Sequence, residues 1–145
     1  MGYGPSKVMR RYNHLLGEID GVYHEMSLRL GLPDSAMMIL YTICDSGGSC
    51  SLREICRSSG LSKQTVNSAL RKLEAEGILY LEAAGARSKN VCLTEAGRQL
   101  AKRTAGRVLA IENEIFASWP REDVERYLGA MERFLSDLRK RASSL

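Results

Sequence analysis

The chain has 145 residues, 44% of them hydrophobic, and a formal net charge of +4 at pH 7. This length and apolar content suit one domain, with or without helical extensions, while the positive charge fits nucleic-acid contact only weakly. No stretch approaches the ~18 apolar residues of a membrane span and no secretory signal is visible, so we expect a cytoplasmic protein with no membrane partner.

The first predicted element is a long N-terminal helix. Its apolar residues recur at steps of three or four, which is the spacing of helices packed lengthwise. They are Val8, Tyr12, Leu15, Ile19, Val22, Met26 and Leu30.

A short helix is predicted to begin at Ser51. Ser51 and Glu54 have the spacing of a capping box, in which a hydroxyl and a carboxylate satisfy each other's backbone amides. Residues 57–60 are expected to form the turn to the next helix. Three side chains are expected to face inward: Leu52, Ile55 and Cys56.

The following segment has the features of a DNA-recognition helix. Ser62 is a good N-cap, Leu61 and Val66 have the spacing of a hydrophobic staple, and Gly77 provides the C-terminal stop. Opposite its outward polar face this helix has one apolar stripe at helical spacing: Val66, Ala69, Leu70 and Leu73.

The outward face of this helix is polar and free of acids from Ser62 to Lys72. An ordinary amphipathic surface helix, the alternative, usually mixes Glu with Lys. In a recognition helix the N-terminal residues reach base edges while flanking cations contact phosphates. Between Ser51 and Lys72 there are five Lys and Arg residues against one acid, Glu54, which suits a polyanionic partner.

After Gly77 the pattern changes from helical to extended. Residues 78–81 and 91–93 are β-prone, and residues 83–86 indicate a turn between them. Arg87 and Lys89 lie at the tip of this hairpin, where an arginine can enter a narrow minor groove. The alternative is a plain surface hairpin with two solvated cations.

Two further helices are predicted to close the chain. One begins at a Thr94 N-cap; Pro120 suits the first turn of the other, where Glu122 and Asp123 complement the helix dipole. The stripe of the first is Leu100, Thr104, Val108, Ile111 and Ile115, and that of the second is Val124, Leu128, Met131, Leu135 and Leu138.

The two helices and the hairpin of residues 51–89 together have the pattern of a winged helix-turn-helix. The N- and C-terminal stripes are longer than the core of such a unit could cover. We infer that they pack against a second copy of the chain; a monomer that folds these helices onto its own core is the alternative.

The run from Ser51 to Gly97 resembles the MarR family of bacterial transcriptional regulators. Leu93, Thr94 and Gly97 match the LT-x-x-G step that joins the wing to a long helix in that family, and residues 73–79 match the exit of its recognition helix. The length and the flanking helices match too. The wing departs from the family pattern of an Asp followed by paired arginines: it has Gly85, Ala86 and Arg87.

The resemblance implies a mainly α fold with a small β-hairpin wing, in which long N- and C-terminal helices form a dimerisation domain. We expect an N-terminal dimerisation helix in residues 1–32, a winged helix-turn-helix DNA-binding domain in residues 33–97 and C-terminal dimerisation helices in residues 98–145.

The predicted function is sequence-specific regulation of transcription, as a ligand-responsive repressor. Its partners would be double-stranded DNA with a pseudo-palindromic operator, a second copy and a small-molecule effector. Gln64 and Asn67 are the best candidates for adenine contacts. The full predicted DNA-binding set is Arg53, Ser62, Lys63, Gln64, Thr65, Asn67, Ser68, Arg71, Lys72, Arg87 and Lys89.

The resemblance also implies an effector pocket between the long helices and the winged helix. Methionine adapts to irregular apolar ligands, but the candidate residues would serve equally well as ordinary core. They are Tyr23, Met26, Met37, Met38 and Tyr41.

The four cysteines, Cys44, Cys50, Cys56 and Cys92, match no zinc or redox spacing. Cys50 lies close to two glycines at the start of a predicted helix, a position that lowers a thiol pKa, so a thiol-based redox-sensing regulator is one alternative.

Another alternative function is a winged helix that serves as a protein-interaction or adaptor module without specific DNA binding. The acid-free face argues against that module, because interaction surfaces favour aromatic residues.

No enzymatic motif is present: there is no phosphate loop, dinucleotide fingerprint, HExxH or nucleophile elbow. His14 and His24 are ten residues apart, which is not the spacing of a helical metal-ligand pair. We therefore expect a protein that is not an enzyme and uses no metal or other cofactor.

Overall fold

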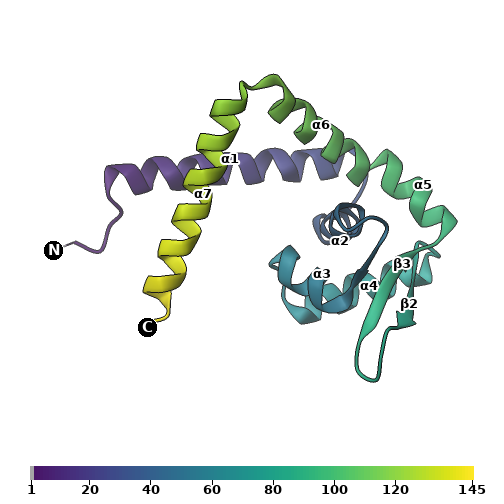
Figure 1. The fold of residues 1–145 in the computed structure, drawn as a ribbon. Helices are drawn as coiled ribbons and strands as arrows, with labels where there is room; N and C mark the ends of the chain where they lie inside the picture. Colours follow the sequence, from purple (N-terminus) through teal and green to yellow (C-terminus); the bar gives the residue numbers. More distant parts are fainter. Residues whose placement is uncertain (1) are drawn as a thin grey trace. The chain divides into compact units, whose positions relative to one another are not determined.

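The computed structural model describes residues 2–145 and confirms the mainly α fold with a small wing (Figure 1). The helices of this part of the chain are α1 (Lys7–Arg29), α2 (Asp34–Asp45), α3 (Leu52–Ser59), α4 (Lys63–Ala75), α5 (Glu95–Arg103), α6 (Ala105–Ser118) and α7 (Arg121–Ala142). The strands are β1 (Ser49–Ser51), β2 (Leu79–Ala83) and β3 (Lys89–Leu93). The chain divides into two compact units, one ending at Val108 and one beginning at Leu109.

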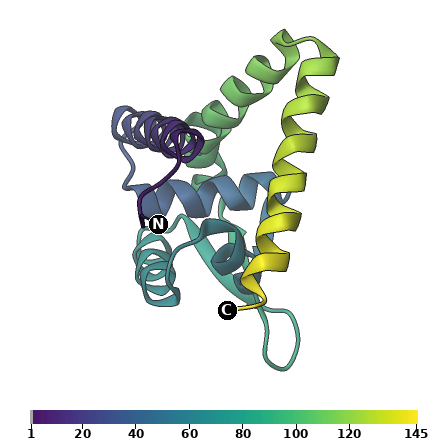
Figure 2. The same cartoon turned by 90° about the vertical axis from the view of Figure 1, so that its left-hand side faces the viewer.

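The core of the first unit surrounds α2. Ile39, Leu40 and Ile43 of this helix are fully buried, as are Ile55 of α3 and Val66 of α4. Figure 2 shows α2 lying across the helix-turn-helix formed by α3 and α4. The winged helix is thus built on α2, which fixes the orientation of α4.

The sheet has the order β1-β3-β2, with both pairs antiparallel. Leu79 lies opposite Leu93 and Leu81 opposite Val91, so these four side chains share the face that packs on the core. The third strand, β1, was not predicted. Its sequence, Ser49-Cys50-Ser51, carries no strand pattern, and it is held by pairing with β3.

Of the two hydrogen bonds expected in the capping box of α3, the structure contains one. The amide of Glu54 donates to the Ser51 hydroxyl (3.1 Å), as expected, but the Glu54 carboxylate binds Arg57 and the Ser58 hydroxyl instead of returning to Ser51. These contacts extend the helix, so residues 57–59 form its last turn. The predicted four-residue turn is wrong, because Gly60, with φ of +68°, makes the turn.

The helix predicted to run on from Thr94 is broken into α5 and α6. Thr104 departs from helical geometry with φ of −126° and ψ of −93°, and its hydroxyl donates to the carbonyl of Leu100 (2.7 Å). A threonine that bonds back to the preceding turn in this way bends a helix. The prediction of one continuous helix is therefore wrong.

Pro120 is the N-cap of α7 and thus lies one residue before its first turn, which contains Glu122 and Asp123 as predicted. None of the described residues of α7 is buried. Its exposed apolar residues are Tyr127, Leu128, Met131, Phe134, Leu135 and Leu138.

The first unit also exposes an apolar stripe, along α1. Most of the predicted seam lies in solvent in the single chain, with Val8 77% exposed, whereas Met26 and Leu30 pack partly against the core. Apolar faces of this extent are unusual on a monomer. Among the described helices, none has the length and hydrophobicity to cross a membrane.

Candidate nucleic-acid interface

The ends of α4 are fixed by local hydrogen bonds. The Ser62 hydroxyl accepts a hydrogen bond from the Thr65 amide (3.1 Å), which confirms the predicted N-cap. At the other end Gly77 has φ of +75°, and the Ile78 amide donates to the carbonyl of Leu73 (2.9 Å). This is the Schellman arrangement that a glycine stop permits.

The buried side of α4 sets the direction of its polar side. Val66, Leu70 and Leu73 are buried against the core, as predicted. Most of the predicted DNA-facing residues of α4 are exposed, and Asn67 is half-buried. The exposed residues are Lys63, Gln64, Thr65, Ser68, Arg71 and Lys72.

The cations of α4 lack the carboxylate partners that some arginines of the molecule have. Arg57 pairs with Glu54 and Arg98 with Glu95. Among the described residues, Lys63, Arg71 and Lys72 form no salt bridge. An exposed cation without a carboxylate partner is available to a phosphate.

The start of α3 adds one exposed cation, Arg53, to those of α4. Arg53 is exposed in the first turn of α3. Next to it, the hydroxyl of Ser58, and to a lesser extent the guanidinium of Arg57, hold the pKa of Glu54 below its usual value. The single acid of this region therefore stays ionised and compensates Arg57, which leaves Arg53 as the available cation.

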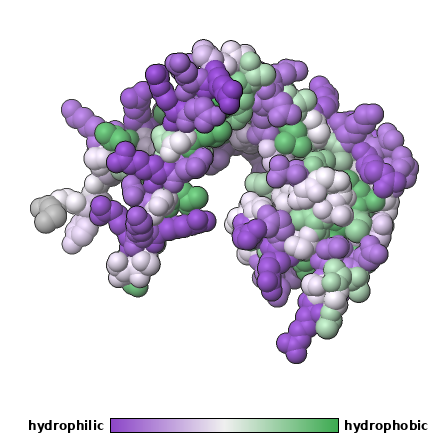
Figure 3. Space-filling model, in the orientation of Figure 1, coloured by the Kyte–Doolittle hydropathy of each residue, from purple (hydrophilic) through white to green (hydrophobic). Residues whose placement is uncertain are grey.

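The wing presents Arg87 and Lys89 at its tip. The loop is closed by the Ala84 amide, which donates to the carbonyl of Ser88 (3.0 Å), and Lys89 pairs with Ala83 across the strands. Both cations are exposed. Figure 3 shows hydrophilic side chains at the end of this hairpin.

The wing and α4 are joined through Thr94. The Thr94 amide donates to the carbonyl of Ile78 (3.0 Å), and its hydroxyl donates to the carbonyl of Gly77 (2.5 Å). The same hydroxyl oxygen accepts a hydrogen bond from the amide of Gly97 (3.0 Å), which caps α5 as predicted. The exit of α4, the end of β3 and the start of α5 therefore meet at one residue.

The residues predicted for an effector pocket have different environments. Met37 is buried in the core, and Met26 and Tyr41 pack partly against it. Tyr23 and Met38 are exposed. A groove with other walls, between the start of α2 and α4, was not found from the sequence, because its residues come from segments some thirty positions apart.

The predicted activation of Cys50 is wrong. Cys50 lies in β1 and is 7% exposed, and burial raises the pKa of its thiol. Burial also raises the thiol pKa of Cys44 and of Cys92. A raised pKa keeps a thiol protonated near neutral pH, so Cys50 lacks the lowered pKa on which the redox-sensing alternative was based.

Within residues 2–145, no three His, Cys, Asp or Glu side chains are grouped closely enough to hold a metal ion.

Comparison with known proteins identifies this architecture. The family model described as "MarR family" matches residues 30–88. No significant match was found among curated protein sequences. The family match confirms the resemblance inferred from the recognition helix and its exit at residues 73–79, and the solved structures share the fold.

Three solved structures illustrate the likeness. The MarR family regulator NMB1585 of Neisseria meningitidis is 19% identical, with 96% of this chain and 99% of that chain covered and a TM-score of 0.82. MepR of S. aureus in its DNA-binding conformation is 18% identical, with 92% and 99% covered and a TM-score of 0.72. BpsR of Bordetella bronchiseptica, whose DNA binding is regulated by 6-hydroxynicotinic acid, is 20% identical, with 86% and 98% covered and a TM-score of 0.60. At these identities the structures establish a shared fold.

Proposed function

We propose that this chain, whose residues 30–88 form a MarR-family winged helix, is a transcriptional regulator that binds a pseudo-palindromic operator as a homodimer. The observation that carries the proposal is the outer face of α4. From Ser62 to Lys72 it holds short hydrogen-bonding side chains and unpaired cations and no acid, while its opposite side is anchored in the core. A rigid helix with this face is suited to a major groove.

The proposed contacts follow from position along α4 and the wing. Gln64 and Asn67, near the start of α4, would read base edges, together with the short side chains of Ser62, Thr65 and Ser68. Arg87 and Lys89 of the wing would enter the adjacent minor groove. The phosphate contacts would come from Arg53, Lys63, Arg71 and Lys72.

Dimerisation is supported by the exposed apolar faces of the two units. The stripe of α1 and that of α7 each leave large apolar side chains in solvent in the single chain. A second copy would cover them in a two-fold arrangement, with residues 1–32 and 98–145 as the dimerisation regions. Such a dimer presents two recognition helices about 10 base pairs apart.

A response to a small molecule is supported by relatives with this fold. BpsR is regulated by 6-hydroxynicotinic acid, and a structure of PcaV from Streptomyces coelicolor contains its natural ligand. We include ligand-responsive repression in the proposed function, with Tyr23, Met26, Met37, Met38 and Tyr41 as the effector residues that the family resemblance implies.

Selection of binding sites from random DNA tests the proposal. The expected product is an inverted repeat with half-sites about one helical turn apart, bound with an affinity that falls steeply as salt rises. Sedimentation of the free protein should give twice the chain mass of 16.1 kDa. A monomer that selects no sequence at low salt would contradict the proposal and favour the protein-interaction module.

A further inference from the structure

The break between α5 and α6 is built into the core of the first unit. Thr104 alone separates the two helices, with φ of −126° and ψ of −93° where a helix has ψ near −42°. Its neighbours on both sides are buried: Ala101 is 3% exposed, Thr104 2% and Ala105 0%. The chain therefore changes direction at a fixed point of the core, and we name residues 101–106 the corner.

The hydroxyl bond of Thr104 does not by itself break a helix. Thr42 is also buried and donates the same kind of bond to the carbonyl of Met38, four residues earlier (2.8 Å), yet α2 continues to Asp45. The corner differs from α2 at Gly106. A Cβ built on Gly106 would lie 3.1 Å from the carbonyl oxygen of Ala101, closer than nine in ten Cβ contacts in proteins.

This close approach belongs to the broken form of the helix. In a continuous helix, residues 101 and 106 would be about 7.5 Å apart along the axis, so a side chain at residue 106 would not meet this carbonyl. Alanine also has a higher helix propensity than glycine. The corner therefore depends on two features of the sequence, the hydroxyl of Thr104 and the missing side chain of Gly106.

The corner lies between the recognition helix and the second unit along the chain. α6 begins in the first unit, which contains α4, and ends in the second unit, which contains α7. The direction in which α6 leaves the core is therefore passed on to α7. The dimer of the proposed function uses the stripes of α1 and α7, so the place of each α4 relative to the two-fold axis depends on this direction.

We propose that the corner sets the distance between the two recognition helices of the dimer, and thereby the preferred spacing of the operator half-sites. Thr104 and Gly106 are its positioning residues, since one holds the break by a hydrogen bond and the other leaves room for it. The half-site spacing rests on the proposed function; the direction of α6 does not.

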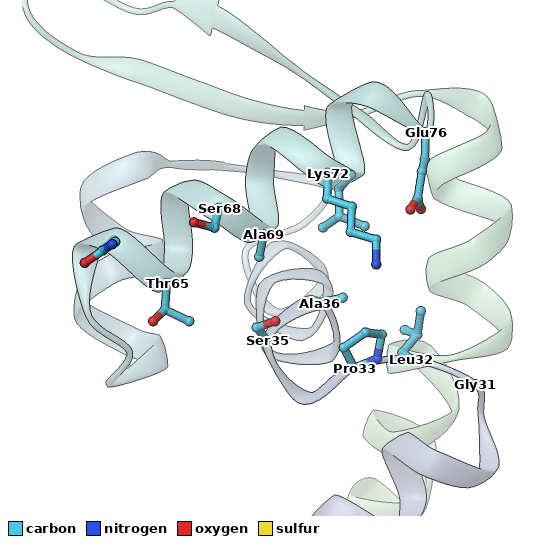
Figure 4. A pocket seen from close by; sticks show the side chains of 12 residues that line it. Gly31, Leu32, Pro33, Ser35, Ala36, Thr65, Ser68, Ala69, Lys72 and Glu76 are labelled. Atoms are coloured by element: carbon cyan, nitrogen blue, oxygen red, sulfur yellow. The ribbon is translucent and has the colours of Figure 1, made fainter.

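A distance within one chain tests the direction of α6 without DNA. Spin labels on unnatural amino acids replace Glu76, exposed at the end of α4 (Figure 4), and Asp137, exposed on α7. Excess unlabelled chain ensures that pulsed electron paramagnetic resonance measures distances within single chains. Loss of a kink of about 20° would move the far end of α6 by about 7 Å, so Thr104→Val and Gly106→Ala should shift the label distance by a similar amount.

Three variants are matched controls and should keep the label distance of the wild type. Thr104→Ser retains the hydroxyl at the corner. Thr42→Val removes the same kind of bond from α2, and Gly17→Ala adds a Cβ where it would meet none of the described atoms within 4 Å. The role of the corner is overturned if Thr104→Val and Gly106→Ala, both folded by circular dichroism, keep this distance. If Thr104→Val does not fold, Gly106→Ala alone decides.

A panel of operators tests the half-site spacing. The half-sites obtained by site selection are moved together or apart by one and two base pairs. A spacing that the dimer cannot span loses the contribution of one half-site, about 100-fold in affinity. Thr104→Val and Gly106→Ala should change the order of preference among the spacings, whereas Thr104→Ser and Thr42→Val should retain it.

An unchanged order of preference in Thr104→Val and Gly106→Ala overturns the link between the corner and the operator, even if the label distance shifts. If no DNA is selected at all, the proposed function fails, while the label distance still decides whether the corner directs α6.

Discussion

Gly97 of α5 lies against the backbone carbonyl of Ile78, at the exit of the recognition helix. A Cβ built on Gly97 would lie 1.9 Å from the Ile78 oxygen, far inside any permitted contact. Together with the hydrogen bonds of Thr94 to Gly77 and Ile78, this close approach fixes α5 against the end of α4. The LT-x-x-G step therefore has a physical cause: the threonine binds the turn and the glycine leaves room for it.

We predict that Gly97→Ala destabilises the winged helix, because the Ile78 carbonyl is backbone and cannot move aside cheaply. The cost should be about 1–3 kcal/mol or more in the free energy of unfolding, measured by urea denaturation. Gly21→Ala is the matched control, since a Cβ on this residue of α1 meets nothing within 4 Å. It should be neutral or stabilising; equal effects of the two substitutions would contradict the close-packing argument.

We predict different DNA phenotypes for Gln64→Ala and Arg71→Ala. Loss of a base contact at Gln64 should cost about 1–3 kcal/mol in binding free energy and relax the preference at one base pair. Loss of a phosphate contact at Arg71 should weaken binding to all DNA sequences alike. It should also reduce by about 1 the slope of log affinity against log salt concentration. Binding to a panel of single-base operator variants at several salt concentrations distinguishes them. A uniform loss for Gln64→Ala would remove this residue from base readout.

We predict that Arg87→Ala weakens binding most at operators with A·T-rich flanks. A narrow A·T-rich minor groove has the strongest negative potential, so an arginine at the wing tip gains most there. Two operators that differ only in their flanks provide the measurement. Arg121→Ala, at the start of α7 and outside the proposed DNA-binding residues, is the control for a general loss of charge. Unchanged affinity of Arg87→Ala for both operators would mean that the wing does not reach the DNA.

We predict that the buried thiols resist oxidation near neutral pH. Burial raises the pKa of Cys50 above its ordinary value, so the protonated form is stabilised in the folded chain. The contribution of the protonated Cys50 thiol to the free energy of unfolding is complete below the ordinary thiol pKa. It is lost as pH rises through the pKa of the folded state. Cys50→Ala should reduce this alkaline loss, measured by urea unfolding across pH. Peroxide treatment at neutral pH should leave DNA binding unchanged, and a marked loss would revive the redox-sensing alternative.

Sequence reasoning succeeded where structure depends on neighbours along the chain. Ser62 and Gly77 delimit α4 as predicted, because an N-cap and a left-handed stop each need only a few adjacent residues. It failed at Cys50, where burial in an unpredicted strand reverses the expected pKa shift. It failed at Thr104 as well, because this residue fits the helical spacing of the predicted stripe, and spacing does not reveal its non-helical backbone angles or its hydroxyl bond to Leu100. The groove beside Lys72 joins two distant segments and leaves no local pattern.

We predict that an aspartate in either apolar stripe produces a folded monomer with weak DNA binding. Ile19 of α1 and Leu135 of α7 are exposed in the single chain, so Ile19→Asp and Leu135→Asp should not unfold it. A carboxylate buried in a dimer interface, however, has no partner and opposes association. Sedimentation should give the single-chain mass, and operator affinity should fall about 100-fold or more because one half-site no longer aids the other.

Ser136→Asp, next to Leu135 but outside the stripe, introduces the same charge and should leave both the dimer and operator binding intact. If both stripe variants remain dimeric, the faces of α1 and α7 are not the interface. If the wild type itself binds its operator as a monomer, the two-fold arrangement is wrong, and the selected DNA should then contain a single half-site instead of an inverted repeat.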